Sequence, residues 1–311
     1  MELVKPGTNI DFIGKRGLCA LLSLGLLSAS LIAIPVRGVR LGIDFAGGTE
    51  IQVKFAPEVE ASEGPIRDVL GAIEGVDNAS VVRYGDLGEN EFLIRFKGDI
   101  NQVGEGSRDR VELIKAGLAG AVGPPVVQRV EFVGPRVGKE LRNDGMLALF
   151  WASVVILIYI AFRFSSRFAP GAIVAVLHDI SITAGIFVIL GMEFDLRILA
   201  AMLAILGYSL NDTIIIYDRI RENLAVHTKV DLPEVLNLSV NQTLSRTVLT
   251  SATTLLALGA LFFLGGEVIR PFAFAMIIGV LVGTYSSVYI ASPTLLLLEQ
   301  RFGGVAGASK K

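Results

Sequence analysis

Six long apolar stretches constrain the fold of this 311-residue chain more than any other feature of its sequence. The stretches run roughly over residues 17–35, 145–162, 168–190, 198–217, 248–265 and 271–298. Because a hydrocarbon core of about 30 Å is crossed by about 20 mostly apolar helical residues, each stretch is long enough to span a membrane. Only 19% of the residues are charged, fewer than the roughly 25% found in soluble domains. The sequence therefore predicts an α-helical membrane protein with six transmembrane helices.

The positions of lysine and arginine predict how the spans are oriented. Twelve of these basic residues flank one side of the predicted bundle, while the short loops on the other side hold only Arg197 and Arg270. Since short cytoplasmic loops carry the excess of basic residues, the twelve mark the cytoplasmic side. The long segment between the first two stretches holds the other fourteen, and long segments cross largely regardless of charge. Both termini are therefore expected to be cytoplasmic.

The chain is expected to divide into three parts. Residues 1–35 form a cytoplasmic tail and the first span, residues 36–142 an extracytoplasmic α+β domain, and residues 143–311 a five-helix transmembrane bundle with a cytoplasmic tail. We expect the first span to be retained rather than cleaved, because a polar segment follows Pro35 without a signal-peptidase-like site.

The extracytoplasmic segment carries a recognisable order of elements. Its residue patterns predict strands over 50–55, 80–84, 91–96 and 126–132 and helices over 63–73 and 107–121. A turn is expected over 85–90, and Ser107 is the expected N-cap of the second helix. The order strand–helix–strand–strand–helix–strand is the ferredoxin-like pattern, which by itself indicates no activity.

The sequence argues against several classes of activity. Cys19 is the only cysteine and His178 and His227 are the only histidines, which argues against a metal centre built from these residues. The Gly-rich run 42–50 lacks the lysine of a phosphate-binding P-loop, so we interpret it as a tight turn, with a weak phosphate cradle as the alternative. The net charge of −2 argues against nucleic acid as a partner. We therefore expect no enzyme, no cofactor and no metal.

Two ionisable residues in the predicted spans are the main functional candidates. Asp212 lies in the fourth stretch, about 7–8 Å inside its cytoplasmic end, and Tyr208 and Ser209 share its helical face. Arg246 precedes the fifth stretch and lies about 9 Å inside the helix if that helix begins near Val240. Since the two depths are similar, the carboxylate and the guanidinium could pair across antiparallel neighbouring helices. Polar residues around Arg246 form a stripe that should avoid lipid: Ser239, Gln242, Thr243, Thr250 and Thr253.

A charged side chain within a span costs about 2.5–3.5 kcal/mol, so it is retained when it pairs, lines a cavity or moves protons. For Asp212 we favour a proton or ion relay, with an ion pair that fixes helix register and simple exposure as alternatives. Arg246 could instead extend to the cytoplasmic surface.

His178 and Asp179 lie about ten residues into the third stretch, near the middle of the membrane. Adjacent helical residues point about 100° apart, so the two need not act together, and at least one should face the bundle interior. Relay and polar helix packing remain the two alternatives for six residues: His178, Asp179, Tyr208, Asn211, Thr243 and Thr250.

Several stretches together resemble the SecF subunits of the SecD/SecF family. They are 42–50 (GIDFAGGTE), 133–141 (VGPRVGKEL), 178–179 (HD), 207–223 (GYSLNDTIIIYDRIREN), 242–251 (QTLSRTVLTS) and 271–293. The resemblance implies one half of a transporter related to the resistance-nodulation-division (RND) exporters, placed in a bacterial plasma (inner) membrane. By motif position, Asp212 corresponds to the family's proton-carrying aspartate and Arg246 to its partner arginine.

The resemblance also implies a function and a set of partners. SecD supplies the other half, and the pair uses the proton-motive force to help draw an unfolded polypeptide out of the SecYEG translocon. The expected partners are therefore SecD, SecYEG, the translocating polypeptide, membrane lipid, SecA indirectly, and the accessory proteins YajC and YidC. The alternatives are half of an RND-type exporter of small molecules or lipids, for which the single outer domain is small, and a scaffold that transports nothing.

Overall fold

The computed structural model describes residues 8–76, 79–85, 89–96, 107–164, 168–227, 229–266 and 268–302, with the side chains of residues 107–109 excepted. The chain separates into two compact units. We call residues 1–40, 147–193 and 197–311 the helical unit, and residues 41–146 and 194–196 the α+β unit. The expected turn over 85–90 lies partly outside the described residues, and the side chain of Ser107 lies outside them altogether.

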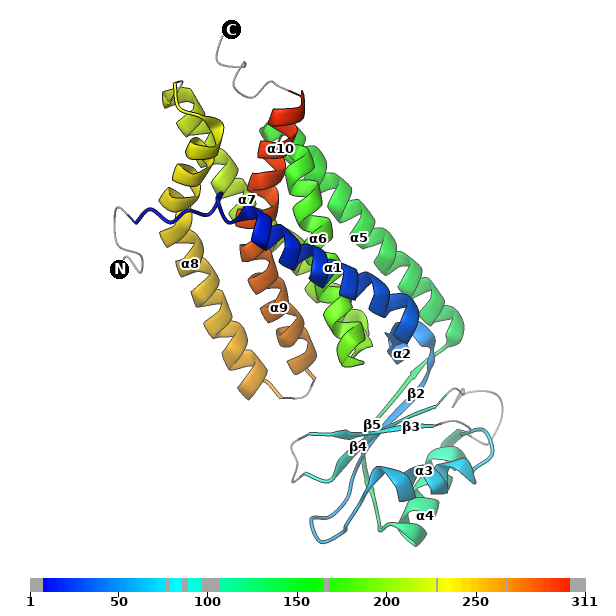
Figure 1. The fold of residues 1–311 in the computed structure, drawn as a ribbon. Helices are drawn as coiled ribbons and strands as arrows, with labels where there is room; N and C mark the ends of the chain where they lie inside the picture. Colours follow the sequence, from blue (N-terminus) through cyan, green and yellow to red (C-terminus); the bar gives the residue numbers. More distant parts are fainter. Residues whose placement is uncertain are drawn as a thin grey trace. The chain divides into compact units, whose positions relative to one another are not determined.

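Within the described residues, six helices are long and apolar enough to cross a membrane, which confirms the predicted number of spans (Figure 1). The first five are α1 (Arg16–Arg37), α5 (Pro135–Arg163), α6 (Ala169–Leu190), α7 (Leu196–Val226) and α8 (Leu232–Leu264). The sixth span consists of α9 (Arg270–Ser286), a π-helical turn η1 (Ser287–Ala291) and α10 (Ser292–Phe302).

Several helices are longer than the apolar stretches that predicted them. Helix α8 begins at Leu232, well before the apolar run that starts at residue 248, and α5 begins at Pro135 rather than near residue 145. Hydropathy marks only the part of a helix that lies in lipid, whereas helical hydrogen bonding continues through adjoining polar residues. Arg246 therefore lies fourteen residues after the start of α8, about 21 Å along the helix rather than the expected 9 Å.

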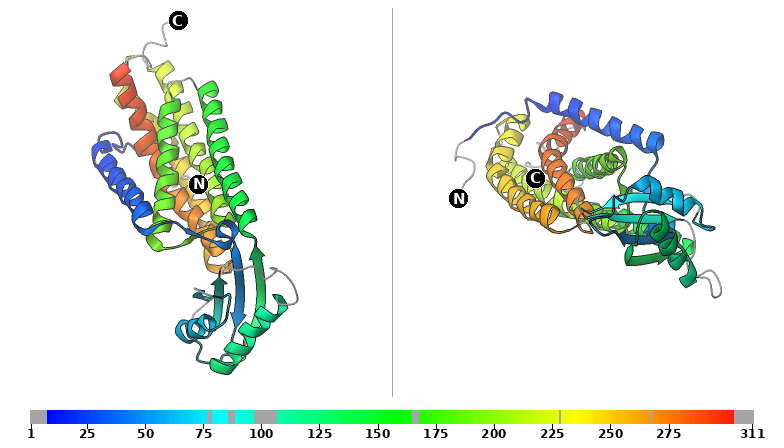
Figure 2. Two further views of the ribbon diagram at one scale, coloured as in Figure 1. Left: turned by 90° about the vertical axis from the view of Figure 1, so that its right-hand side faces the viewer. Right: turned by 90° about the horizontal axis from the view of Figure 1, so that it is seen from below.

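The helical unit has a buried centre and an apolar surface. In α6, α7 and the sixth span, half of the residues in the most apolar segment of the helix are buried. The corresponding share is only 11% in α1 and α5 and 17% in α8. The outer helices expose large apolar side chains such as Leu21, Phe162 and Leu264, as expected where lipid is the solvent. Figure 2 shows α1, in blue, running along the outside of the bundle.

Small residues bring the central helices close together. A Cβ atom at Gly283 of α9 would lie 2.9 Å from Cβ of Ser209 on α7, and one at Gly279 would lie 2.2 Å from Ile205 Cγ1. Lipid provides no hydrophobic drive for helix association, so close packing and interhelical hydrogen bonds must supply it. The Gly-xxx-Gly face of the sixth span therefore packs directly against α7.

The α+β unit contains a four-stranded antiparallel sheet in the order β3-β4-β2-β5. Its elements follow the predicted order: β2 (Gly48–Lys54), α3 (Glu63–Gly71), β3 (Ser80–Tyr84), β4 (Glu91–Phe96), α4 (Ser107–Ala121) and β5 (Val126–Val133). Alternate residues of the central strands, such as Ile51 and Ile94, are fully buried on one face of the sheet. They form one core with Ile66 of α3 and Ile114 of α4, so both helices cover that face.

The Gly-rich run 42–50 forms a short helix and a turn. Helix α2 (Ile43–Ala46) ends at Gly47, whose φ of 72° lies in the left-handed region, and the Gly47 N–H donates to the Ile43 carbonyl at 2.9 Å. This agrees with the tight turn expected from the sequence. The Asp44 carboxylate accepts a hydrogen bond at 3.0 Å from the N–H of Leu196, the first residue of α7, and so satisfies one of its free amide groups. Two short strands that are distant in sequence, β1 (Arg40–Leu41) and β6 (Glu193–Phe194), form a separate two-stranded sheet.

Glu91 is a buried acid on the face of the sheet opposite the core. Its carboxylate accepts hydrogen bonds from Lys54 Nζ at 2.6 Å, Gln52 Nε2 at 3.0 Å and Gln128 Nε2 at 3.2 Å. Burial by itself raises the pKa of Glu91, but these hydrogen bonds and the charge of Lys54 outweigh it and hold this pKa below its ordinary value. The carboxylate therefore links β2, β4 and β5 in its ionised form.

Acidification is expected to loosen the sheet around Glu91. Because the folded-state pKa of Glu91 is lower than its unfolded-state value of about 4.3, its stabilising contribution is complete above that value and is lost as the pH falls through the folded-state pKa. We expect amide protection of β2 and β4 in the full chain, corrected for intrinsic exchange rates, to fall between about pH 6 and pH 3. The Glu91→Gln variant should be less protected at the higher pH and change less. An equal pH-dependent loss in both proteins would contradict this role of Glu91.

Candidate functional site

Asp212 lies in α7 and is almost completely buried, with 1% of its surface exposed. Its Oδ2 atom accepts a hydrogen bond from Thr284 Oγ1 of α9 at 3.5 Å, the long end of the usual range. Thr284 Oγ1 in turn lies 2.7 Å from Ser251 Oγ of α8. Among the described residues, Oδ1 of Asp212 has no hydrogen-bond partner. Because an unpaired buried carboxylate is costly, Asp212 is a group that would gain from binding a proton or another partner.

Arg246 lies on α8 and is exposed in the isolated chain. Within the part of the chain that the structure describes, its guanidinium forms no ion pair with Asp212, although its charge acts on that carboxylate through space. The direct pair considered from the sequence is therefore not formed in this conformation. Helices α7 and α8 are joined elsewhere, by Asn223 Nδ2, which donates to Ser239 Oγ and Gln242 Oε1, both at 2.9 Å.

The threonines of the predicted polar stripe bond within their own helix. Thr243 Oγ1 donates to the carbonyls of Ser239 and Val240, and Thr250 Oγ1 donates to those of Arg246 and Thr247. This is the ordinary way in which a helical threonine satisfies its hydroxyl group. The structure therefore does not bring Thr243 or Thr250 to Asp212.

The neighbours of Asp212 on α7 differ in their surroundings. Asn211 is exposed, and Tyr208 is half-buried with a hydroxyl group that is buried and has no partner among the described residues. Ser209, one turn before Asp212, is buried and contacts α6 through its hydroxyl group. Ser209 therefore links α7 to α6 close to Asp212.

His178 and Asp179 both face the interior of the bundle, with 5% and 1% of their surfaces exposed. Their side chains contact each other directly, since His178 Nδ1 lies 2.9 Å from Asp179 Oδ1. Their Cα–Cβ bonds point in different directions, but the outer atoms of the two side chains turn toward one another. The two residues thus belong to one cluster, a relation that the spacing of their backbone positions left open.

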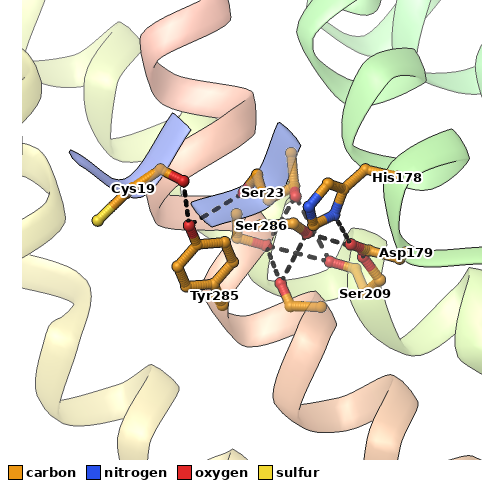
Figure 3. A network of polar contacts seen from close by, with 10 residues as sticks. Cys19, Ser23, His178, Asp179, Ser209, Tyr285 and Ser286 are labelled. Atoms are coloured by element: carbon orange, nitrogen blue, oxygen red, sulfur yellow. Dashed lines mark hydrogen bonds and ion pairs between the residues drawn. The ribbon is translucent and has the colours of Figure 1, made fainter. Parts of the chain in front are cut away.

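A network of polar contacts surrounds Asp179 (Figure 3). The hydroxyl groups of Ser209 and Ser286 both donate to Asp179 Oδ2, and the second of these bonds is 2.7 Å long. The His178 ring stacks on Tyr285, with ring centroids 6.2 Å apart. Tyr285 reaches α1 as well, because its hydroxyl group donates to the Cys19 carbonyl at 2.7 Å. The network therefore connects α1, α6, α7 and α9.

Sequence reasoning missed Ser286 and Tyr285 and gave no role to the hydroxyl group of Ser209. All three lie in apolar spans, where a polar side chain tends to face another helix rather than lipid. That signal was present, but it marks every buried hydroxyl group equally and does not tell which helix each one meets. The structure supplies that information.

Two family models match the sequence. The model described as "Protein export membrane protein SecD/SecF, C-terminal" matches residues 115–301, and the model described as "SecD/SecF GG Motif" matches residues 32–59. The first covers Asp212, Arg246 and the cluster around Asp179, and the second covers the turn at Gly47.

Curated relatives match the chain over nearly its full length. Protein translocase subunit SecF of Calditerrivibrio nitroreducens is 42% identical over 96% of this chain and 97% of its own. Those of Pseudomonas aeruginosa and Magnetococcus marinus are 42% and 44% identical over 95% and 96% of this chain, and 93% and 95% of their own.

The solved structures give a matching result. The crystal structure of SecDF from Thermus thermophilus, described as a translocon-associated membrane protein, has a TM-score of 0.83 and 36% identity to this chain. The match covers 97% of this chain but only 40% of the SecDF chain. The six spans, the family models and the full-length relatives agree, and the chain therefore belongs to the SecD/SecF family of protein-export membrane proteins, as one of its SecF subunits.

Proposed function

We propose that this SecF subunit couples the proton-motive force to late steps of protein export by loading and unloading a proton at Asp212. The observation that carries the proposal is that Asp212 is 1% exposed within a transmembrane helix and has one oxygen without a partner among the described residues. An ionisable residue at such a position is a functional candidate by default because lipid makes it costly to retain. Membership of a protein translocase family supplies the process that the proton would drive.

The chemistry of the step follows from the surroundings of Asp212. A neutral carboxylic acid can donate a hydrogen bond, whereas a carboxylate can only accept hydrogen bonds. Proton uptake by Asp212 therefore changes the hydrogen bonds that it can form with Thr284 at Oδ2 and with a partner at Oδ1. The positive charge of Arg246 acts on Asp212 from α8, and a movement of α8 would change that influence. Each elementary charge that crosses the membrane potential is worth about 2.3 kcal/mol per 100 mV, enough to bias a bundle with two packings.

The roles of the other candidate residues follow from their contacts. We assign Asp212 and Arg246 to the proton site and treat Thr243, Thr250, Tyr208 and Asn211 as polar packing or surface residues. His178 and Asp179 belong to a separate buried cluster.

The partner that fits this chain best is SecD. The matched SecDF chain is more than twice as long as the region that this chain covers, which leaves a second half to be supplied by another subunit. We propose SecYEG as the translocon that is served, an unfolded polypeptide as the cargo, SecA as an indirect partner, and YajC and YidC as accessory partners. The exporter alternative is not favoured, because the relatives are named as translocase subunits.

We further infer the placement of the chain. The excess of basic residues on one side of the bundle supports cytoplasmic termini in a bacterial inner membrane, with the α+β domain of residues 36–142 outside. The sheet order β3-β4-β2-β5, with both helices on one face, supports a ferredoxin-like topology for this domain.

Ion flux in vesicles that contain the SecD–SecF pair tests the proposal. We expect Asp212→Asn to abolish proton flux driven by an imposed gradient while the pair stays assembled, because an amide cannot bind and release the proton. Asp218→Asn is the matched control: it makes the same change on α7, but at a partly exposed carboxylate that pairs with Arg163 and Arg221. Wild-type flux and secretion in Asp212→Asn would overturn the proposal. Replacing Asp212 and Arg246 together by leucine without loss of export would favour the scaffold alternative.

A further inference from the structure

A second buried acid, Asp179, lies in the same bundle as Asp212 but in the opposite bonding situation. In the described part of the chain, Asp212 has a single long hydrogen bond, whereas Asp179 accepts bonds from two serines at one oxygen and contacts His178 through the other. Both carboxylates are 1% exposed. Among the described residues, His178 from the same helix and Tyr285 from α9 are titratable residues of the Asp179 cluster, and Tyr285 in turn contacts Tyr289 of η1 and the carbonyl group of Cys19 on α1.

The two serines come from the two helices that form the Asp212 site. Ser209 is three residues before Asp212 on α7, which is less than one helical turn, and Ser286 is two residues after Thr284 at the end of α9. The acceptor Oδ2 of Asp179 is therefore shared by α7 and α9 next to the point where Thr284 donates to Asp212.

The geometry points to Asp179 as a positioning residue for the proposed proton site: by holding Ser209 and Ser286 together, it sets the position of Thr284 relative to Asp212. This inference rests on the proposed function. It gives the buried His178–Asp179 pair a task that does not require it to carry the transported proton. Asp179 acts on Asp212 through two helices and does not touch it.

Close packing makes the two helices sensitive to this bond. Gly283 lies against Ser209, where an added Cβ would come within 2.9 Å of the serine Cβ, so α7 and α9 touch through their backbones at this level. The π-helical turn η1 starts directly after Ser286, and its first residue, Ser287, bonds Thr213 of α7 at 2.8 Å. π-Helical turns are rare and occur mostly as single turns within α-helices, frequently at functional sites. Asp179 bonds the residue just before this turn and Thr213 bonds its first residue.

The hydrogen bond from Thr284 to Asp212, which a movement of α9 would change, is already weak. Thr284 reaches Asp212 at 3.5 Å, where a displacement of a few tenths of an ångström decides whether a hydrogen bond exists. Loss of the bond between Ser286 and Asp179 frees the segment of α9 that carries Thr284, because Thr284 is only two residues before Ser286. The expected consequence is a change in the pH at which the proton site loads, with the complex still assembled.

The test measures proton flux against pH in vesicles that contain the SecD–SecF pair. We expect Ser286→Ala and Asp179→Asn to shift the pH of half-maximal flux by about half a unit or more, the size expected when a hydrogen bond to the proton-binding group changes. Ser292→Ala is the matched control, because Ser292 is an equally buried serine of the same span whose hydroxyl group, within the described residues, bonds the Ser287 carbonyl of its own span and no other helix. It should leave the midpoint unchanged.

A double variant separates positioning from general support of the fold. If Ser286 acts through Thr284, then Ser286→Ala should cause no further shift once Thr284→Val has removed the hydroxyl group that reaches Asp212. An unmoved midpoint in Ser286→Ala, or an equal shift in both backgrounds, would overturn the inference. If Asp179→Asn fails to assemble, the serine variants still decide. Wild-type flux in Asp212→Asn would remove the proposed function together with this inference, whereas abolished flux there with an unmoved midpoint in Ser286→Ala would remove the positioning role alone.

Discussion

Replacing Gly47 by alanine is expected to destabilise the folded protein by about 2–5 kcal/mol and to lower its yield strongly. Gly47 has a φ of 72°, which an L-residue adopts only at a cost of roughly 1–2 kcal/mol. Its new Cβ would also lie 2.7 Å from the Cα and 3.1 Å from the N of Pro135. Since both atoms belong to the backbone, no side-chain rotation relieves the clash, and the start of α5 must move away from α2. Such overpacking typically costs about 1–3 kcal/mol in addition.

The yield of folded protein in the membrane and the thermal unfolding temperature of the purified chain measure this effect. Gly38→Ala is the matched control, because Gly38 has the same φ of 72° but no atom within 4 Å of an added Cβ. It carries the backbone strain without the clash, so its unfolding temperature should fall by much less. Equal losses in the two variants would show that the contact with Pro135 is unimportant. The positive φ angles of Gly38 and Gly47 give a physical reason for glycine at both positions, which lie in the segment that the GG motif model matches.

The six spans could be predicted from the sequence because lipid leaves few alternatives. An apolar run of about 20 residues must form a helix there, since every backbone polar group needs an internal partner. The order of elements in the α+β unit was equally accessible, because its strands alternate apolar and polar residues and its helices repeat them every three or four positions. Both predictions depend on local patterns alone.

Helix ends were less predictable for the same reason. The apolar run of the fifth span starts at residue 248, but α8 starts at Leu232, since a helix needs only backbone hydrogen bonds to continue outside lipid. Arg246 consequently lies about 21 Å from the start of its helix rather than the expected 9 Å, which is a distance along the helix and not a depth in lipid. Helix α7 likewise extends past its apolar stretch, to Val226, so Asp212 lies fourteen residues from the end of α7 and Arg246 fourteen residues from the start of α8. The similar positions expected for the two residues are therefore kept, and what the sequence did not give is which faces of the two helices meet.

The candidate site divides in the same way between local and non-local information. Asp212 and Asp179 could be found from the sequence because a carboxylate within an apolar run is rare and costly. Their different bonding could not be found, because it depends on whether Ser209 and Ser286 meet one acceptor across three helices. Helical spacing tells which residues share a face, but it does not tell which helix that face meets.

Replacing Gly185 by alanine is expected to separate α1 from α6 while the rest of the bundle stays folded. The added Cβ would lie 2.1 Å from the Cβ and 2.6 Å from the Cα of Ser30, so the α1 backbone itself must move. Because helix association in lipid depends on close packing and hydrogen bonds, a displaced α1 would also lose the bonds of Tyr285 to Cys19 and Ser23. Nothing in the lipid would replace them.

Thiol labelling measures the displacement directly, because Cys19 on α1 is the only cysteine of the chain. We expect a membrane-permeant maleimide to label Cys19 several times faster in Gly185→Ala than in the wild type, since its close surroundings on α9 are lost. Gly25→Ala, on α1 with no atom within 4 Å of an added Cβ, should leave the rate unchanged. Adding Ser30→Gly to Gly185→Ala removes the Cβ and Oγ atoms at 2.1 Å but keeps the Cα at 2.6 Å, so it should slow the labelling only part of the way to the wild-type rate. Wild-type labelling of Cys19 in Gly185→Ala itself would show that close packing at Ser30 is not what holds α1 in place.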